Sequence, residues 1–132
     1  MGLKSEGGIS GQYFICSTET NEIVGDVQIH SLSLLNNHCE IGCTVPPKHQ
    51  GKGYCTESIK AIIRYIFEES NVNRIEIITS EINKPCMKVC EKLHLNQEAI
   101  LREKTCIGGE YYNDVLFSIL RKEYDTWLLS FF

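Results

Sequence analysis

A proline pair, a glycine-rich loop and a long apolar stripe follow one another in residues 46–67, which read PPKHQGKGYCTESIKAIIRYIF. Because proline cannot donate a hydrogen bond to a β-ladder, the pair ends the strand-like run His38–Val45. After the loop, apolar side chains recur at the i, i+3, i+4, i+7 spacing of an amphipathic helix, which we expect over Thr56–Ser70. The residues of this stripe are Ile59, Ile62, Ile63, Ile66 and Phe67. A strand followed by a core-packed helix predicts an α/β fold.

The segments around this helix have the patterns of further strands. The run RIEIITS, Arg74–Ser80, is rich in β-branched residues, so strand, helix and strand predict a parallel crossover. Asn83 is placed to cap a second helix that ends near His94. The tail RKEYDTWLLSFF predicts a short helix that covers the core or a partner, which leaves a homodimer open. The other expected strands, in a meander at the start and a hairpin at the end, are Gln12–Cys16, Ile23–Leu34, Gln97–Ile107 and Glu110–Leu120.

Length and composition describe one folded domain. The 132 residues suit a single core, so we expect one domain over residues 1–132, with residues 1–11 flexible. No apolar run approaches the roughly 20 residues that span a bilayer, and the start lacks a signal-peptide core, so we expect a cytoplasmic protein without a membrane partner. The net charge of −4 argues against a nucleic-acid partner. Seven cysteines without a C-x-x-C pair predict mostly buried, reduced thiols.

The glycine-rich loop is placed to bind an anion. A loop that enters a helix N-terminus offers unpaired N–H groups and the positive end of the helix dipole, which suit phosphate. A dinucleotide fingerprint is excluded because Thr56 stands in place of its third glycine. A P-loop is excluded because Gly51-Lys52 is followed by Gly53 rather than Ser or Thr. The pattern that remains is QGKGY, residues 50–54.

This pattern resembles the Q/R-x-x-G-x-G/A loop of the GNAT superfamily of acetyl-CoA-dependent N-acetyltransferases. The blocks CEIGCTV and NKPCMKVCEKLHL also resemble the family, and GEYYNDVLFSILRKEY is similar to the branch of the RimL and RimJ ribosomal-protein acetyltransferases. The resemblance covers roughly residues 22–124. It implies a mixed, mostly antiparallel sheet with a central pair of splayed parallel strands and flanking helices. Family members normally have a further first strand and a helical wall, which we do not expect residues 2–11 to supply.

The resemblance also implies where acetyl-CoA binds. Main-chain amides of the loop would receive the pyrophosphate, and the strand end would pair with the pantetheine arm. Asn83 would contact the cofactor side of the cleft, or act only as a helix cap. Lys52 contacts phosphate or is a solvated lysine, and Cys55 replaces the usual Gly or Ala. His94 replaces a usual glycine, which predicts a less favourable helix end. The implied cofactor residues are Thr44, Val45, Gln50, Gly51, Lys52, Gly53, Tyr54, Cys55 and Asn83.

In this family the amine attacks the thioester directly within a ternary complex, which calls for a base and for an acid that reprotonates the departing thiolate. By resemblance, Glu40 takes the place of a catalytic glutamate, and the alternative is a solvent-facing strand carboxylate. Cys90 stands where many members have the proton-donating tyrosine, and Cys86 where the RimL-like branch often has serine. The alternatives to donation by these thiols are their simple burial, or donation by Tyr111 or Tyr112.

The implied activity is transfer of an acetyl group from acetyl-CoA to an amine acceptor. A protein N-terminus or ribosomal protein is the first expectation, and a small amine of the polyamine type is the second. A third hypothesis is a catalytically weak acetyl-CoA-binding or interaction domain, because the usual helix tyrosine is absent. No metal is required by this chemistry. A zinc site built from Cys39, Cys43, His49 and Cys55 matches no common ligand spacing.

Overall fold

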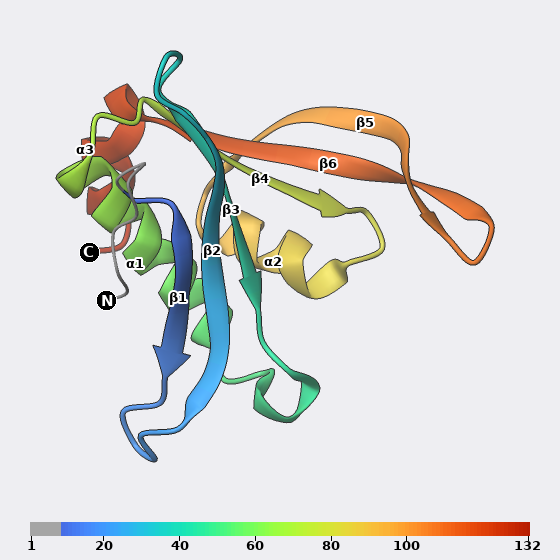
Figure 1. The fold of residues 1–132 in the computed structure, drawn as a ribbon, viewed down its shortest axis with the longest axis horizontal. Coiled ribbons are helices and arrows are strands. Elements are labelled where there is room, and N and C mark those ends of the chain that lie inside the picture. Colours follow the sequence, from blue (N-terminus) through green and yellow to red (C-terminus); the bar gives the residue numbers. More distant parts are fainter. Residues whose placement is uncertain (1–8) are drawn as a thin grey trace.

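The computed structural model describes residues 9–132, which form one sheet and three α-helices (Figure 1). Short 3-10 turns at Pro47–His49 and Arg121–Glu123 precede α1 and α3. Residues 1–8, where we expect flexibility, lie outside the described part, whereas Ile9 is buried and Gly11 opens β1. The elements are β1 (Gly11–Cys16), β2 (Ile23–Ser33), β3 (His38–Thr44), α1 (Tyr54–Glu69), β4 (Arg74–Ser80), α2 (Lys84–Lys92), β5 (Asn96–Ile107), β6 (Glu110–Leu120) and α3 (Tyr124–Leu129).

The sheet has the strand order β1-β2-β3-β4-β6-β5, and β3 with β4 is its parallel pair. Every other neighbouring pair is antiparallel, which confirms the predicted mixed, mostly antiparallel α/β fold. The parallel pairing begins at His38 opposite Arg74 and stops at Glu40 opposite Glu76. Both strands nevertheless continue, to Thr44 and Ser80. The two strands therefore separate beyond Glu40, as the resemblance implied.

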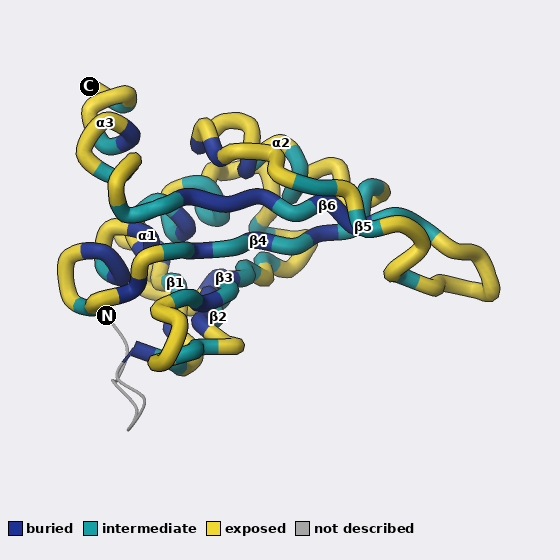
Figure 2. Tube along the Cα trace, turned by 90° about the horizontal axis from the view of Figure 1, so that it is seen from above, coloured by how far each residue is buried: buried dark blue, intermediate teal, exposed yellow. Residues whose placement is uncertain are grey.

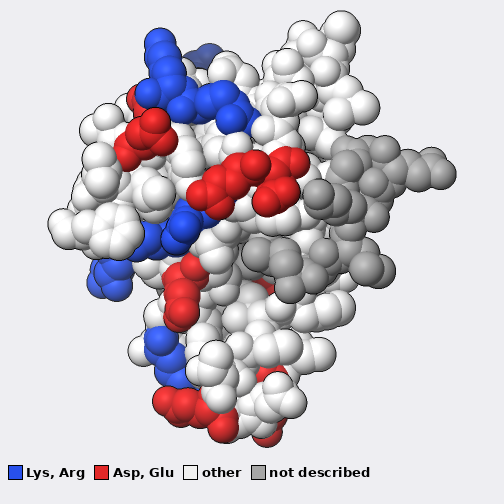
Figure 3. Space-filling view, turned by 90° about the vertical axis from the view of Figure 1, so that its left-hand side faces the viewer, with Lys and Arg blue, Asp and Glu red and all other residues white. Residues whose placement is uncertain are grey.

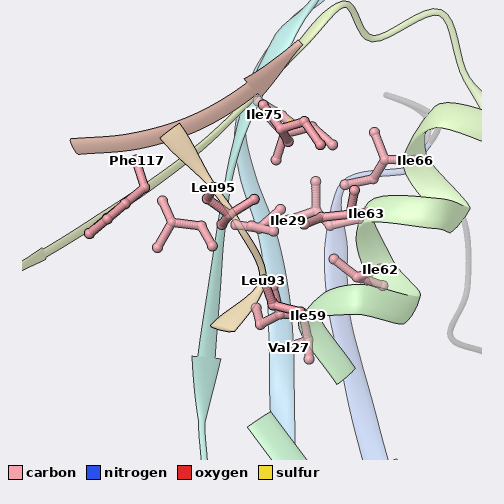
Figure 4. Close-up of a cluster of buried hydrophobic side chains, with 14 of the residues drawn as sticks. Val27, Ile29, Ile59, Ile62, Ile63, Ile66, Ile75, Leu93, Leu95 and Phe117 are labelled. Carbon is pink, nitrogen blue, oxygen red and sulfur yellow. The ribbon is translucent and has the colours of Figure 1, made fainter. Parts of the chain in front are cut away.

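The core lies between one face of the sheet and the helices. The stripe predicted for α1 is buried, and its isoleucines meet alternate residues of β2, β3, β4 and β6 (Figure 4). Burying an isoleucine stabilises a fold by about 2 kcal/mol, so this contact is a major part of the stability. Cys90 of α2 and Leu93, the residue after α2, join the same cluster, and Trp127 of α3 donates its indole N–H to the Leu93 carbonyl. The tail predicted to cover the core or a partner thus packs on the protein's own core.

The opposite face of the sheet carries polar and half-buried side chains. Strand residues alternate between the two faces, so Glu40, Glu76 and Ser118, which lie opposite one another across β3, β4 and β6, share this second face. No helix within residues 9–132 covers them, because α1, α2 and α3 contribute to the cluster on the other side. The outer part of the β5–β6 hairpin is exposed and projects from the sheet (Figures 1 and 2).

Arg121, just after β6, closes the C-terminal end of α1. Its guanidinium donates to the carbonyl oxygens of Phe67, Ser70 and Val72 at 2.9, 2.6 and 2.9 Å. The last carbonyls of a helix have no partner within it, so this side chain takes the place of a C-terminal cap. The guanidinium also lies 5.3 Å from the Phe67 ring centroid. One residue thereby joins α1, the approach to β4 and the end of β6.

Several predicted details needed correction. The first helix begins at Tyr54 rather than Thr56, because Gly53 adopts a left-handed conformation and serves as its N-cap. The second helix ends at Lys92, and His94 has a φ of +56°, which confirms the unfavourable backbone expected there. The expectation of mostly buried cysteines was wrong. All seven are free thiols, but only Cys39 and Cys90 are fully buried, and Cys16 and Cys106 are exposed.

The surface near α1 carries charges of both signs. On the side shown in Figure 3, Lys and Arg side chains alternate with Asp and Glu side chains over the described residues. One such pair is Arg64 with Glu68, one turn apart on α1 at 3.8 Å. No helix in residues 9–132 is long and apolar enough to cross a membrane.

Candidate functional site

The shape of the loop between β3 and α1 depends on two glycines in a left-handed backbone conformation. Gly51 and Gly53 both have a φ of +80°, a conformation that other residues adopt only at a cost of about 1–2 kcal/mol. Nothing lies within 4 Å of a Cβ built at either position, so backbone conformation rather than crowding requires glycine. The Gln50 side chain donates from Nε2 to the Val45 carbonyl at 2.9 Å. Gln50 therefore fastens the loop to the end of β3.

The loop leaves backbone donors free at the start of α1. The first helical bond runs from Glu57 N–H to the Gly53 carbonyl, at 3.0 Å. The N–H groups of Gly51, Lys52 and Gly53 donate to no acceptor within residues 9–132. Together with the first turn of α1 they form a row of N–H groups at the positive end of a 16-residue helix. This arrangement suits a phosphate anion.

A cavity of about 420 Å³ lies between this loop and α2. Loop residues 49–51 and 53–56 line one side, and Lys84, Lys88 and Lys92 line the other. No carboxylate lines it. The lysines recur every four residues, which places them on one face of α2. The sequence motifs did not identify these lysines as site residues, although their four-residue spacing in NKPCMKVCEKL indicates that they share one helix face. The cavity has the size and positive charge for a polyphosphate group.

A second cavity, of about 170 Å³, lies where β3 and β4 separate. Ile41 and Cys43 line it from β3, and Ile77 and Thr79 from β4. The N-terminal turn of α1 and one face of α2 close it. Its four thiols are Cys43, Cys55, Cys86 and Cys90. The two cavities share Cys55 and Val89 among their lining residues. Beyond Glu40 the facing edges of β3 and β4 do not pair with each other.

The thiols in this cleft interact in two pairs, Cys86 with Cys90 and Cys43 with Cys55. The Cys90 thiol donates to Cys86, and the Thr79 hydroxyl also donates there, so the pKa of Cys86 falls to about 6 despite partial burial. The bond to Cys86 and burial raise the pKa of Cys90. In the same way, donation from Cys43 lowers the pKa of Cys55, while the pKa of Cys43 rises. These interactions favour the thiolate form of Cys86, and proton donation by Cys86 or Cys90 stays a prediction.

Glu40 lies at the point where the parallel strands separate. Its side chain is on the sheet face opposite Cys39 and Ile41, and it is 26% exposed. Its carboxylate lies 3.3 Å from His30 Nε2 on β2, and the facing residue on β4 is Glu76. Glu40 lines neither of the two cavities, and its carboxylate lies on the open face of the sheet, away from the α2 thiols.

The chain matches the family model described as Acetyltransferase (GNAT) domain over residues 3–96. This match covers most of the sequence. The chain belongs to the GNAT acetyltransferase family. It is also 31% identical, over 117 residues, to the uncharacterized N-acetyltransferase p20 of Bacillus licheniformis. That alignment covers 89% of this chain and 66% of the relative.

Two further comparisons agree with this family assignment. The putative ribosomal N-acetyltransferase YdaF of Bacillus subtilis is 28% identical over 103 residues, which are 78% of this chain and 56% of YdaF. The crystal structure of a GNAT-family acetyltransferase from Bacillus anthracis superimposes with a TM-score of 0.76 at 27% identity, covering 85% of this chain and 67% of that one. The chain spans about half to two thirds of the curated relatives that it matches.

Of the other residues singled out in the sequence, Asn83 lines the narrow cleft and the rest lie outside the two cavities. Asn83 caps α2 by accepting the Cys86 N–H at 3.2 Å, and it also lines the narrow cleft. The cap is observed, and the cofactor contact stays a prediction. Lys52 lines a separate hollow beside residues 17–20. Tyr111 and Tyr112 lie on the projecting hairpin, where Tyr112 donates to Glu110 at 2.7 Å. Within residues 9–132, no group of three or more His, Cys, Asp or Glu is placed to hold a metal.

Proposed function

We propose that the protein is an acetyl-CoA-dependent N-acetyltransferase that acetylates the α-amine of a protein N-terminus. The observation that carries this proposal is a row of free N–H groups at the wide end of a splayed parallel strand pair. This combination accounts for both ends of the cosubstrate. The N–H groups suit its phosphates, and the unpaired strand edges suit the amide groups of its pantetheine arm.

Binding of the cosubstrate divides between the two cavities. The loop from Gln50 to Cys55 holds the pyrophosphate, and the α2 lysines add positive charge on the other side of the same cavity. The main chain near Thr44 and Val45 pairs with the pantetheine arm. Gly25 of β2 approaches the Thr44 carbonyl so closely that a side chain would collide with it. That contact fixes the strand end, so the phosphate and thioester subsites keep their spacing.

The acceptor amine enters from the open face of the sheet. Bound acetyl-CoA supplies an activated acyl group, and the amine must lose a proton to attack it. Glu40, at the end of the parallel pairing, takes that proton directly or through a water molecule. An α-amine titrates near 8 and a lysine amine near 10.4, so an N-terminal acceptor asks less of a carboxylate base. This difference favours a protein N-terminus over a lysine side chain.

Relatives support two acceptor classes. YdaF carries a ribosomal name, and the ribosomal protein uS5 alanine N-acetyltransferase of Escherichia coli is 26% identical over 112 residues. The second candidate acceptor is a polyamine, because the spermidine N(1)-acetyltransferase of Vibrio cholerae is 23% identical over 111 residues. The face that carries Glu40 also presents Asp26, which would attract a polycation, whereas Glu76 is already paired with Arg74 at 2.9 Å.

The test is turnover of acetyl-CoA with a panel of amines: peptides with free N-termini, the same peptides with blocked N-termini, and spermidine. Acetylated product is followed by mass spectrometry, since the protein's own thiols would disturb a thiol assay. We expect product only with free N-termini. Product with spermidine alone would move the assignment to the second candidate. Binding without turnover across the panel would leave a cofactor-binding domain.

Glu40→Gln tests the base within the same assay. The amide keeps the size of the side chain but cannot accept the amine proton, so we expect kcat to fall about 100-fold while acetyl-CoA affinity stays within about twofold. Glu110→Gln, on the hairpin, is the matched control and should keep full turnover. An unchanged kcat in Glu40→Gln would remove this residue as the base.

A further inference from the structure

Two cysteine thiols of α2 line the narrow cleft. Cys86 is the third residue of α2, near the positive end of the helix dipole, and its own N–H is already bonded to the Asn83 side chain. It is only partly buried, and it lines the cavity between the splayed strands. Cys90, one turn later, is completely buried and lines the same cavity. Thr79 faces the pair from β4.

We propose that Cys86 is an acyl-acceptor thiol, which takes the acetyl group from acetyl-CoA by thiol–thioester exchange when no amine occupies the cleft. The inference rests on the proposed function, because it needs the thioester to lie where β3 and β4 separate. Of the two α2 cysteines that line the cleft there, Cys86 is partly exposed, whereas Cys90 is completely buried. The site is thus a modification site as well as part of the acyl cleft.

The exchange balances without an oxidant or a metal. The Cys86 thiolate attacks the thioester carbonyl carbon, and a new bond forms between that carbon and Sγ. The bond from the carbon to the coenzyme sulfur breaks, and coenzyme A leaves as a thiolate that takes a proton from water. The Cys90 thiol and the Thr79 hydroxyl donate to the attacking sulfur before the reaction. They act as positioning residues, because they hold Cys86 in its charged form.

The neighbouring thiols provide an internal comparison. The pKa values of Cys43 and Cys90 are raised, so both stay protonated and unreactive near neutral pH. Cys16 and Cys106 are exposed but lie outside the narrow cleft. Exchange governed by bulk accessibility would modify those two first. The pKa of Cys55 is also lowered, but Cys55 lines the phosphate-sized cavity as well as the narrow cleft. Exchange governed by the narrow cleft would modify Cys86, and this contrast makes the inference testable.

The experiment uses the full chain with a large excess of acetyl-CoA over free coenzyme A and no amine, which pulls the exchange toward the protein. Intact mass is recorded over time, and digestion then locates the modified residue. We expect one added acetyl group on Cys86, released by neutral hydroxylamine as a thioester requires. The Cys16→Ser/Cys106→Ser double variant should still be acetylated. Cys86→Ser should lose the adduct.

A pH series tests the charged form directly. The initial rate of adduct formation should follow a midpoint near pH 6, the pKa of Cys86. In Thr79→Val, which removes one donor at nearly constant volume, the midpoint should move upward toward the ordinary value for cysteine. A midpoint that does not move would remove Thr79 as a positioning residue. Mapping on the wild-type chain keeps the main test independent of whether any variant folds.

Titration calorimetry with acetyl-CoA, on the same sample, separates the two proposals. Binding with an adduct on Cys86 supports the inference. Binding without an adduct, or with acetylation first at any cysteine other than Cys86, overturns it and leaves the proposed function intact. An absence of binding overturns both.

Discussion

At the scale of single residues, the three lysines on α2 show the clearest mark of a ligand. Lys84, Lys88 and Lys92 lie one turn apart, an arrangement in which like charges destabilise a helix by a few tenths of a kcal/mol per pair. The cavity that they line contains no carboxylate to offset them. A polyanion bound in the cavity, such as the phosphates of acetyl-CoA, would attract all three lysines and so offset the repulsion between them.

Lys88→Gln tests this reading of the lysine face. Lys88 is the central lysine, so its loss should weaken acetyl-CoA binding about three- to tenfold, or about 0.7–1.4 kcal/mol. The dependence of the affinity on salt should also become shallower, because one charge contact is gone. Titration calorimetry at two salt concentrations measures both effects. Lys104→Gln, on the exposed hairpin, is the matched control, and equal weakening in both variants would contradict a specific phosphate contact.

Residues also differ in how far the sequence revealed their roles. The glycines of the loop could be recognised because a left-handed turn before a helix depends on neighbouring positions alone. Gln50 was assigned to the cofactor site as part of the loop whose main-chain amides bind pyrophosphate, and this stays a prediction. Its side chain bonds to Val45 and shapes the loop, which the motif did not reveal. The pairing of Cys43 with Cys55 depends on where β3 ends relative to α1, which no local pattern contains.

At the scale of elements, Arg121 shows how a side chain from one strand end stabilises a distant helix. Its three hydrogen bonds reach carbonyls 49 to 54 residues earlier in the chain. Arg121→Ala would leave those carbonyls without their partner, so the free energy of unfolding should fall by about 2–3 kcal/mol. Urea unfolding measures the change. Arg64→Ala, which removes only an exposed pair, should cost less than about 0.5 kcal/mol, and equal losses would show that Arg121 does not cap α1.

Arg74 and Glu98 join β4 to β5 across the intervening β6. The Arg74 guanidinium binds the Glu98 carboxylate through two hydrogen bonds of 2.8 and 2.7 Å, and Ser118 of β6 donates to the same carboxylate. The bonds from Arg74 and Ser118 lower the pKa of Glu98 to about 2. A carboxyl whose pKa is lowered by folding stabilises the fold above its unfolded pKa and loses that contribution as the pH falls.

Glu98→Gln should therefore destabilise the protein in a pH-dependent way. Glu98 is more than a third exposed, so we expect a cost of only about 1 kcal/mol at pH 7. The difference from the wild type should be constant above about pH 5. It should shrink between the unfolded value near 4.5 and the folded value near 2, and vanish below that. Urea unfolding at stepped pH measures this difference, and a gap that persists at the lowest pH would show that the ionised carboxylate is not the cause.

Elements with strong periodicity were predictable, and their ends were less so. The stripe of α1 and the β-branched run of β4 fixed both elements, because each depends on residues a few positions apart. The start of α1 was placed two residues late, since Gly53 acts as its cap through backbone conformation rather than through a side chain. The tail was predicted as a helix, but its contact between Trp127 and Leu93 required the folded arrangement.

At the scale of the whole molecule, the candidate site is built around the point where the parallel strands β3 and β4 separate. Beyond Glu40 the sheet opens, with a glycine loop at the wide end, thiols on the helix side and a carboxylate on the open side. The family resemblance supplied this arrangement, since no local pattern states where a parallel pair parts. The central claim is that this opening binds acetyl-CoA.

Titration of acetyl-CoA into the wild-type chain and into Gly53→Val tests that claim most directly. Valine at a φ of +80° is strained by about 1–2 kcal/mol, so the variant should lose the row of free N–H groups. Circular dichroism confirms that both proteins are folded. We predict one saturable site in the wild type, with a dissociation constant of about 1–100 μM, and binding at least tenfold weaker in Gly53→Val. The absence of binding in the folded wild type, or equal affinity in the two proteins, would contradict the claim that this opening binds acetyl-CoA.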